Sequence, residues 1–423
     1  MTFLNSKYFL SIKTFNLIIA LSLFLLNSKA LSLPQFSRRY NVSCNMCHAG
    51  VPRLNAIGYK FRAAGFRMPD EIGKEMKLDF DQLNSVRAEL AAYINGTKNK
   101  STDESQTLTQ TQFKRVVIHP LTGTFGSHIG TAAELAFPGG DKVEIEQTHI
   151  RYAFGNEDLF GSFRVGVFHA FDGFSSADRP IGISRPLIQT SESFRGNTET
   201  LFSVAEPSTA GFSVAYLIKN TNLSLSFLNR SGVEVSGDEA ELNYQSDESR
   251  RLSDLLFTST SIFDETGPGS ALTLYYYHGQ SVIPINTNTY ITSGSGPTYA
   301  NNFNRIAVYA NYFINERWSL IAGDGLGKDQ LPNNGGDLNS SGYFVGAESY
   351  ISNRSLAGGI RFDEFNGDRD NNESKTNSGT AYINWMPSDQ LRLVVELQQL
   401  TNGRSVPNSV EQFQMTTDVT FMF

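Results

Sequence analysis

From about residue 81 to the C-terminus, apolar and polar residues alternate over repeated segments of roughly ten residues, separated by turn residues. Segment 390–400 shows the pattern. Its apolar positions are Leu391, Leu393, Val395 and Leu397, and its polar positions are Arg392, Glu396 and Gln398. A period of two is typical of a β-strand whose two faces meet different environments. Because lipid penalises charge, the charged face predicts a polar lumen, and we expect an all-β transmembrane barrel over residues 81–423.

Two further segments repeat this alternation. In segment 305–314 the apolar face is Ile306, Val308, Ala310, Tyr312 and Ile314, and the opposite face carries Arg305, Tyr309 and Asn311. The last segment places Phe413, Met415, Val419, Phe421 and the terminal Phe423 between Gln412, Gln414, Thr416, Asp418 and Thr420. A soluble β-sandwich is the alternative, but it needs no apolar stripe on nearly every strand and no apolar C-terminal residue.

The spacing of turns predicts the number of strands. Short turns fit at 121–123, 155–157, 206–208, 315–317, 353–354 and 387–389. Long polar loops fit at 96–106, 171–198, 281–302, 325–340, 366–376 and 402–410. With both termini in the periplasm, this threading gives 18 antiparallel strands if a weak segment at 239–245 is counted. Because single-chain bacterial barrels have an even number of strands, 16 is the alternative.

Residues 1–30 predict an export signal. Lys7 and Lys13 precede an apolar run at 17–26, and the small residues around Ala30 form a cleavage site. The apolar run is too short to span a bilayer, although an uncleaved anchor is the alternative. No later stretch approaches the roughly 18 apolar residues that a membrane helix needs. We therefore expect the mature chain in the bacterial outer membrane.

Composition agrees with a barrel and narrows the partners. The chain has 31 Phe, 17 Tyr and 36 Gly, and only 18% of its residues are charged. Its net charge of −7 argues against nucleic acid as a partner. Outer-membrane lipid is the partner that this composition favours.

The only two cysteines of the chain, Cys44 and Cys47, form the motif C-x-x-C-H with His48. Thiols at this spacing reach the two vinyl groups of one porphyrin, and the adjacent histidine ligates the iron. The alternative is a Cys44–Cys47 disulfide with an unrelated His48. A thioredoxin-like pair needs a βαβ context, and no such pattern is expected here. A zinc site needs further ligands nearby, and the chain has no other cysteine. The sequence therefore predicts one covalently bound haem c.

The remaining haem contacts leave alternatives open. Met68 is the candidate sixth ligand, because a thioether is an established axial ligand. His128 or His149 from the barrel wall could serve instead, and Met68 could be simple packing. Arg38 and Arg39 could pair with the haem propionates, or could be solvated.

A short amphipathic helix is expected after the motif, within an N-terminal cytochrome segment at 31–80. Pro52 suits its first turn and Gly65 its end. Its apolar face is Leu54, Ile57, Phe61 and Ala64. We assign this face to the haem, and packing against the barrel wall alone is the alternative. A segment this short builds no sufficient core alone, so we expect it to dock at the periplasmic side of the barrel or in its lumen.

Four carboxylates crowd a predicted outer loop: Asp363, Glu364, Asp368 and Asp370. Oxygen ligands suit hard divalent cations, so these residues form a candidate cation site. A solvated acidic loop is the commoner explanation for such a run.

The N-terminal segment resembles the fused cytochrome–porin family of outer-membrane iron oxidases. The matching residues are Phe36, Arg38 and Arg39, then Cys44 to His48, Pro52, Leu54, Gly58, Phe61, Arg62, Gly65 and Phe66. The sequence departs from the family pattern at Asn41, where glycine is expected, and at Ile57, where phenylalanine is expected. The resemblance is specific over residues 36–66, and the rest of the chain matches only in architecture.

This resemblance implies that an extracellular donor, Fe(II), gives an electron to the haem. The haem passes it to a periplasmic cytochrome or another soluble carrier, and the barrel insulates the path. The chain is then an electron-transfer protein, and at most a ferrous-iron oxidoreductase. One alternative is a solute-conducting porin in which the haem domain is a structural plug or redox gate. Another is an enzyme with an open haem position.

Overall fold

The computed structural model describes residues 35–99, 105–138, 143–168, 181–195, 198–201, 209–229, 236–237, 240–241, 252–264, 267–284, 298–331, 335–351, 355–371, 374–402 and 410–422. The expected export signal at 1–30 lies outside these residues. So do residues 31–34 of the expected cytochrome segment.

The described strands form a closed antiparallel barrel of 16 strands, so the count of 18 was wrong and its alternative is confirmed. The strands are β3 (Ser85–Asn99), β4 (Ser105–His119), β6 (Ile129–Phe137), β7 (Glu144–Gly155), β8 (Leu159–Phe168), β11 (Thr209–Ile218), β12 (Thr221–Asn229), β15 (Leu252–Ile262), β16 (Ala271–Pro284), β17 (Thr298–Asn315), β18 (Trp318–Gln330), β19 (Asp337–Ile351), β20 (Leu356–Asn366), β21 (Lys375–Ser388), β22 (Leu391–Asn402) and β23 (Val410–Met422). The last strand pairs with the first, as in Phe413 opposite Gly96, and so closes the wall.

The weak segment at 239–245, which decided between 18 and 16 strands, contributes no barrel strand among its described residues. β13 (Ser236–Gly237) and β14 (Ala240–Glu241) pair only with each other, and β9 (Glu192–Arg195) pairs only with β10 (Thr198–Leu201). Residues 242–245 of the weak segment lie outside the described residues. A short extra strand, β5 (Gly123–Phe125), pairs with β6. The longest described strand of the wall, β17, has 18 residues.

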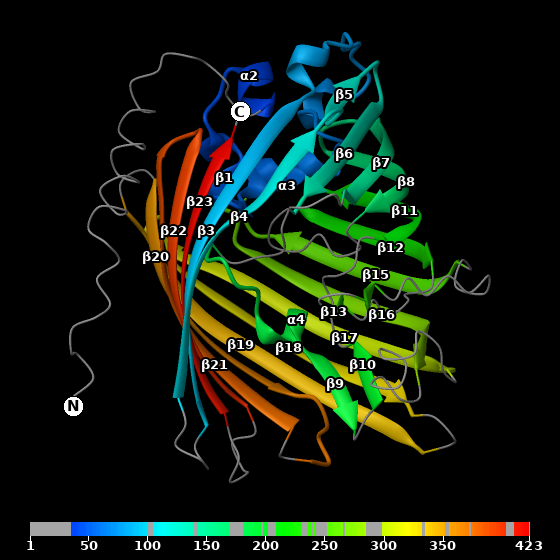
Figure 1. Ribbon diagram of the computed structural model, residues 1–423. Coiled ribbons are helices and arrows are strands. Elements are labelled where there is room, and N and C mark those ends of the chain that lie inside the picture. The colour runs from blue at the N-terminus through cyan, green and yellow to red at the C-terminus, as the bar shows by residue number, and fades with distance from the viewer. Residues whose placement is uncertain are drawn as a thin grey trace.

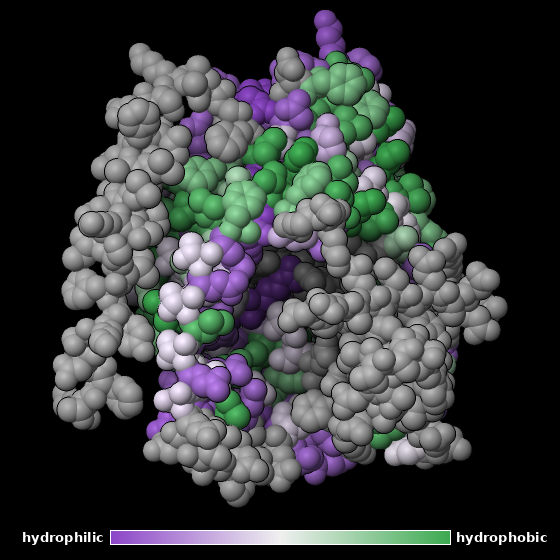
Figure 2. Space-filling view, in the orientation of Figure 1, coloured by the Kyte–Doolittle hydropathy of each residue, from purple (hydrophilic) through white to green (hydrophobic). Residues whose placement is uncertain are grey.

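The alternation read from the sequence is confirmed in the wall. On β17, Ile306, Tyr312 and Ile314 are more than half exposed on the outer face, whereas Arg305 and Asn311 are buried toward the lumen. Figure 2 shows apolar side chains gathered in a band across the strands and hydrophilic ones in the hollow that they surround. An apolar outer band around a polar interior is the arrangement that a membrane-spanning barrel requires.

The N-terminal segment lies at the end of the barrel that carries short turns, near the C-terminus (Figure 1). Its elements are α2 (Gln35–Tyr40), η1 (Cys44–Met46), β1 (His48–Gly50), β2 (Arg53–Leu54), α3 (Ala56–Ala63), η2 (Pro69–Glu71) and η3 (Phe80–Gln82). The segment is less helical than expected, since a hairpin of β1 and β2 precedes α3. The helix also begins at Ala56, not near Pro52, because the Asn55 side chain caps it. Gly65, with φ of 77°, follows its end.

A second segment, residues 181–190, runs inside the barrel and contains α4 (Leu187–Thr190). The backbone amides of Ile183 and Ser184 donate to Glu396 on β22, at 2.7 and 3.0 Å. Around α4 lies an apolar core that the alternation alone does not predict for a lumen. Its members are Phe168, Leu187, Ile188, Leu228, Leu256, Tyr275, Ala307, Tyr309, Ile321, Phe344 and Phe365. The inner segment and this core therefore occupy part of the lumen at this level.

None of the helices in the described part of the chain is both long and apolar enough to cross a membrane.

The exposed apolar band generates a test of membrane insertion. Ile360 projects from the middle of β20 with 64% of its surface exposed, and Phe80, in η3 outside the wall, is 61% exposed. We expect Ile360→Lys to lower the unfolding free energy in lipid vesicles by about 2–4 kcal/mol, because lysine near the bilayer midplane is costly. Phe80→Lys is the matched control and should change little. Equal losses from the two variants, measured by urea titration, would contradict a lipid-facing β20.

Candidate functional site

The C-x-x-C-H motif forms a tight loop at one mouth of the barrel. Cys44 and Cys47 are both free and half-buried, so the disulfide alternative is not formed. The backbone amide of Cys47 donates to the Cys44 carbonyl at 3.2 Å and closes the turn. The backbone amide of Cys44 donates to Asp389 Oδ1, in the turn between β21 and β22, at 3.2 Å. The motif is thereby fastened to the rim of the barrel.

Asn55 joins this loop to α3, a role that the sequence reasoning missed. Its Nδ2 donates to the carbonyls of Asn45 and Met46 at 3.3 and 3.0 Å, and its backbone amide donates to the Cys47 carbonyl at 2.9 Å. Its Oδ1 accepts from the Gly58 amide at 2.9 Å and caps the helix. An asparagine directly before a helical run was the available signal.

Gly58 allows α3 to lie directly against the motif. A Cβ atom at this position would lie 2.0 Å from the Cys47 carbonyl oxygen. This contact is with backbone, so it cannot be relieved by rotating a side chain. The close approach of helix and loop therefore requires glycine here.

The chemistry of the donor set fits a c-type haem. His48 Nδ1 lies 3.2 Å from the Pro52 carbonyl, which can only accept, so Nδ1 carries the proton and Nε2 keeps its lone pair. Burial lowers the pKa of His48 to about 4, so the imidazole is neutral at pH 7. Burial raises the pKa of Cys44 to about 12 and that of Cys47 to about 11, which keeps both as thiols. Two thiols and an oriented neutral histidine are the groups that haem attachment uses.

A buried ion pair fixes the segment to the wall. Arg53 of β2 and Glu348 of β19 are 1% and 0% exposed, and Arg53 Nη2 donates to Glu348 Oε1 at 2.9 Å. Tyr350 and Tyr382 donate their hydroxyls to the same carboxylate at 2.9 and 2.6 Å. The backbone amide of Ile181, from the inner segment, also donates to it at 3.3 Å. Glu348 thus connects the N-terminal segment, the wall and the inner segment.

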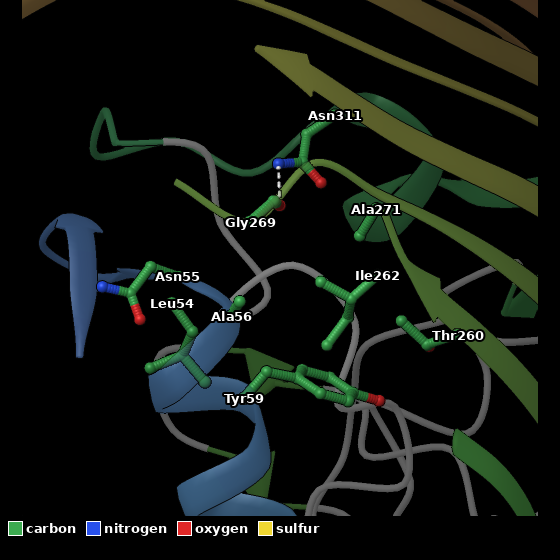
Figure 3. Close-up of a pocket in the computed structure, with 9 residues that line it drawn as sticks. All are labelled: Leu54, Asn55, Ala56, Tyr59, Thr260, Ile262, Gly269, Ala271 and Asn311. Atoms are coloured by element: carbon green, nitrogen blue, oxygen red, sulfur yellow. Dashed lines mark hydrogen bonds between the residues drawn. The ribbon is translucent and has the colours of Figure 1, made fainter. Parts of the chain in front are cut away.

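The helix that follows packs against the wall. Ala56 and Tyr59 form a small apolar cluster with Ile262, and Ala271 packs against it. A small cavity opens between α3 and strands β15 to β17, next to the hydrogen bond from Asn311 Nδ2 to the Gly269 carbonyl (Figure 3). Phe61, on the other side of the helix, contacts Phe36 and Tyr40 with ring centroids 5.0 and 5.6 Å apart. Of the apolar face assigned to the haem, Ala64 packs with Phe160 and Leu217 of the wall, and Phe61 contacts α2.

The other candidate haem residues are spread over the segment. Met68 precedes η2, and its backbone amide donates to Glu71 at 3.0 Å. Arg38 donates to the Asn84 carbonyl, and Arg39 donates to the Thr124 carbonyl at 2.8 Å. Both arginines therefore donate hydrogen bonds to backbone carbonyls. Met68 as a ligand and the propionate contacts stay predictions.

The two wall histidines differ in environment. His149 is buried on β7, with its ring centroid 6.4 Å from Phe66 of the N-terminal segment. His128 stacks on Tyr152 at 5.0 Å, and its Nδ1 lies 2.8 Å from the Ala153 carbonyl. Of the two, His149 is the one that contacts the N-terminal segment through a ring.

The four acidic residues of the expected cation site do not form one group. Asp363 is buried in the lumen, where it pairs with Arg361 at 2.8 Å, whereas Glu364 pairs with Lys375 at 2.7 Å. The side chain of Asp368 accepts from the backbone amide of Asp370. Among the described residues, no group of three or more His, Cys, Asp or Glu could hold a metal ion. Adjacent positions on a strand point to opposite faces, so a run of acids there is divided.

Comparison with known proteins identifies the barrel type. No protein-family model matches the sequence, and no curated protein matches it. The fold is similar to an anion-selective porin from Comamonas acidovorans, with a TM-score of 0.54 and 11% identity over 80% of this chain and 99% of that one. The outer membrane channel DcaP of Acinetobacter baumannii is also similar, with a TM-score of 0.48 and 10% identity over 82% of this chain and 99% of that one. The chain has the fold of an outer-membrane porin.

The ion pair of Arg53 and Glu348 gives a test of how the segment is held. Arg53→Met should weaken docking by roughly 3–5 kcal/mol, because it leaves a buried carboxylate without its cation. Protease cleavage of residues 35–82 in the folded barrel would measure this. Arg53→Met with Glu348→Gln should recover much of the loss. Lys74→Met, which breaks an exposed pair with Asp70, is the control and should have little effect. Similar cleavage of Arg53→Met and Lys74→Met would refute the anchoring role.

The contact at Gly58 gives a second test. Gly58→Ala should destabilise the segment by about 1–3 kcal/mol, because the added methyl overlaps the Cys47 carbonyl. Hydrogen exchange of the α3 amides would report the loss. Gly379→Ala, where an added Cβ meets open space, is the matched control. Unchanged exchange in Gly58→Ala would show that helix and loop are not in direct contact.

Proposed function

We propose that this chain is an outer-membrane electron-transfer protein, in which one haem c is attached to Cys44 and Cys47 at the periplasmic mouth of the barrel. The observation that carries the proposal is a complete C-x-x-C-H loop with two free thiols in a segment docked to the wall through a buried ion pair. A diffusion pore has no use for such a loop. The periplasmic assignment follows from the short turns at this end.

The apolar core inside the barrel supports the same function. An insulating sleeve must pass electrons and exclude solutes, and apolar packing excludes water and ions. The core around α4 lies inside the barrel, and the N-terminal segment lies at the end near the C-terminus. The charged wall residues near the inner segment are engaged with it, as when Arg361 Nη1 donates to the Ser184 carbonyl at 2.9 Å. These contacts hold the inner segment in place.

Each residue of the site has a definite task in this proposal. When bound, the haem supplies reversible one-electron chemistry at its iron. His48 would hold the iron through Nε2, while the Pro52 carbonyl fixes the orientation of its ring. Asn55 holds the attachment loop, and Arg53 holds the segment in the mouth. Met68 is proposed as the sixth ligand, with Arg38 and Arg39 toward the propionates.

The donor and acceptor come from the family resemblance. Fe(II) on the extracellular side is the proposed donor, and a soluble periplasmic cytochrome is the proposed acceptor. In this proposal, a periplasmic carrier approaches the attachment loop at the rim, which Cys44 contacts through Asp389.

A solute-conducting porin is the second candidate, and the fold comparison favours it. A solved porin with this barrel is described as anion-selective. In this reading the N-terminal segment is a plug or redox gate, and solutes pass when it moves. The two candidates differ in whether electrons cross while solutes do not.

Vesicles that hold the haem-loaded protein and trap ferricyanide separate these candidates. External Fe(II) should bleach the trapped ferricyanide while a trapped neutral sugar is retained. His48→Ala should abolish the bleaching, because the iron loses its ligand, and His278→Ala on β16, bonded to Asn304, should not. Haem content is measured in parallel. Vesicles that release the trapped sugar would favour the porin. Vesicles that retain the sugar but show no bleaching of ferricyanide would refute the electron conduit.

A further inference from the structure

Asp324 is a carboxylate on the lipid-facing side of β18. The outward-facing side chains of this strand are all exposed, and they are Trp318, Leu320, Ala322, Asp324, Leu326, Lys328 and Gln330. Trp318 begins the strand after the short turn, and Lys328 lies near its other end. With a rise of about 3.3 Å per residue and a tilt of about 45°, Asp324 lies about 14 Å from the level of Trp318 and about 9 Å from that of Lys328. It therefore lies well inside an apolar band that is about 25 Å tall.

The neighbours of Asp324 on the outer face are apolar or aromatic. Val308 of β17 and Tyr343 of β19 lie directly opposite it. Leu326 on its own strand and Val345 on β19 are 48% and 51% exposed. An ionisable side chain in such surroundings is costly, and in membrane proteins it marks a partner or a functional site.

The basic residues of the surrounding strands already have other partners. β17, β18 and β19 contain two of them, Arg305 and Lys328. Arg305 pairs with Asp329 on the lumen side at 2.7 Å, and Lys328 pairs with Asp337 at 2.7 Å. Asp324 itself has no hydrogen bond or ion pair with another described residue. These three strands therefore leave its charge uncompensated.

The carboxylate cannot turn into the lumen to reach water. The inner side of β18 is tightly packed beside it, where a Cβ at Gly323 would lie 2.3 Å from Phe344 Cε1 and one at Gly325 would lie 2.7 Å from Ile188 Cδ1. An aspartate side chain is also too short to reach the head-group layer from this depth. Compensation must therefore come from outside the barrel.

We propose that the outer face of β18 around Asp324 docks a second membrane-embedded protein, which presents a lysine or arginine to this carboxylate. A charge-assisted hydrogen bond is strong where water is excluded. Ala322 and Ala310 lie opposite each other beside Asp324, and small side chains let membrane-embedded segments approach closely. A twofold contact with a copy of this chain through the same face would bring two carboxylates together, so charge favours a different protein. This inference goes beyond electron transfer and concerns the outer wall alone.

Photo-crosslinking in the native outer membrane tests this contact, with the full-length, haem-loaded chain carrying benzoylphenylalanine in place of Ala322. We expect a cross-linked product with one other membrane protein, whose cross-linked peptide contains a lysine or arginine. Asp324→Leu should give at least tenfold less product, because the partner's basic side chain loses its counter-charge. Asp158→Leu, at the exposed turn between β7 and β8, is the matched control and should give the full yield.

Exchange of the two charges makes the test specific. Asp324→Lys should abolish the product, and changing the partner's basic residue to glutamate should restore it. A product that joins two copies of this chain, an equal yield in the parent and Asp324→Leu, or the absence of any protein product would overturn the proposal. Should Asp324→Leu fail to fold, Asp324→Asn provides the same comparison.

Protein-free lipid vesicles give a second measurement, in which no partner is present. There the carboxylate meets lipid alone, so Asp324→Leu should unfold at a higher urea concentration than the parent, whereas Asp158→Leu should not. An unchanged or lower midpoint in Asp324→Leu would show that the carboxylate is not a burden in lipid, against the proposal. Neither measurement reads the haem, so a failure here is distinct from a failure of the electron conduit.

Discussion

The arrangement of the lumen depends on one buried carboxylate. Glu348 accepts hydrogen bonds from Arg53, Tyr350, Tyr382 and the amide of Ile181, so three separate parts of the chain converge on one side chain. A carboxylate in such surroundings is tolerated only because its partners satisfy it. The ion pair is therefore better understood as a device that fixes the register of the segment in the barrel than as a source of net stability.

Much of the fold followed from the sequence, because lipid imposes a simple rule on every strand. The alternation around Arg305 and Ile306 predicted which side chains face outward, and the structure agrees. The strand count was less certain, since segment 239–245 had too weak a pattern to decide it. The apolar core around Leu187 and Ile188 was not predicted, because an apolar residue on the lumen side looks like a break in the alternation.

The sequence predicted which residues carry the chemistry of the site, but not which residues hold them in place. Cys44, Cys47 and His48 were recognised from spacing, which is a local property. Asn55 and Arg53 were missed, because their roles depend on contacts with residues near in space and distant in sequence. The acidic positions Asp363 and Glu364 looked like one cluster in the sequence, but a strand separates neighbours to opposite faces.

The length of β17 has a consequence at the membrane surface. Its 18 residues extend about 60 Å along the strand, or roughly 40 Å along the bilayer normal at a tilt of about 45°. The hydrocarbon core is about 30 Å thick, so part of β17 stands in the head-group layer. Exposed polar side chains pair there, as in the hydrogen bond from Gln280 to Asn302 at 2.9 Å. Lipid head groups and water, not acyl chains, are therefore the neighbours of this end of the strand.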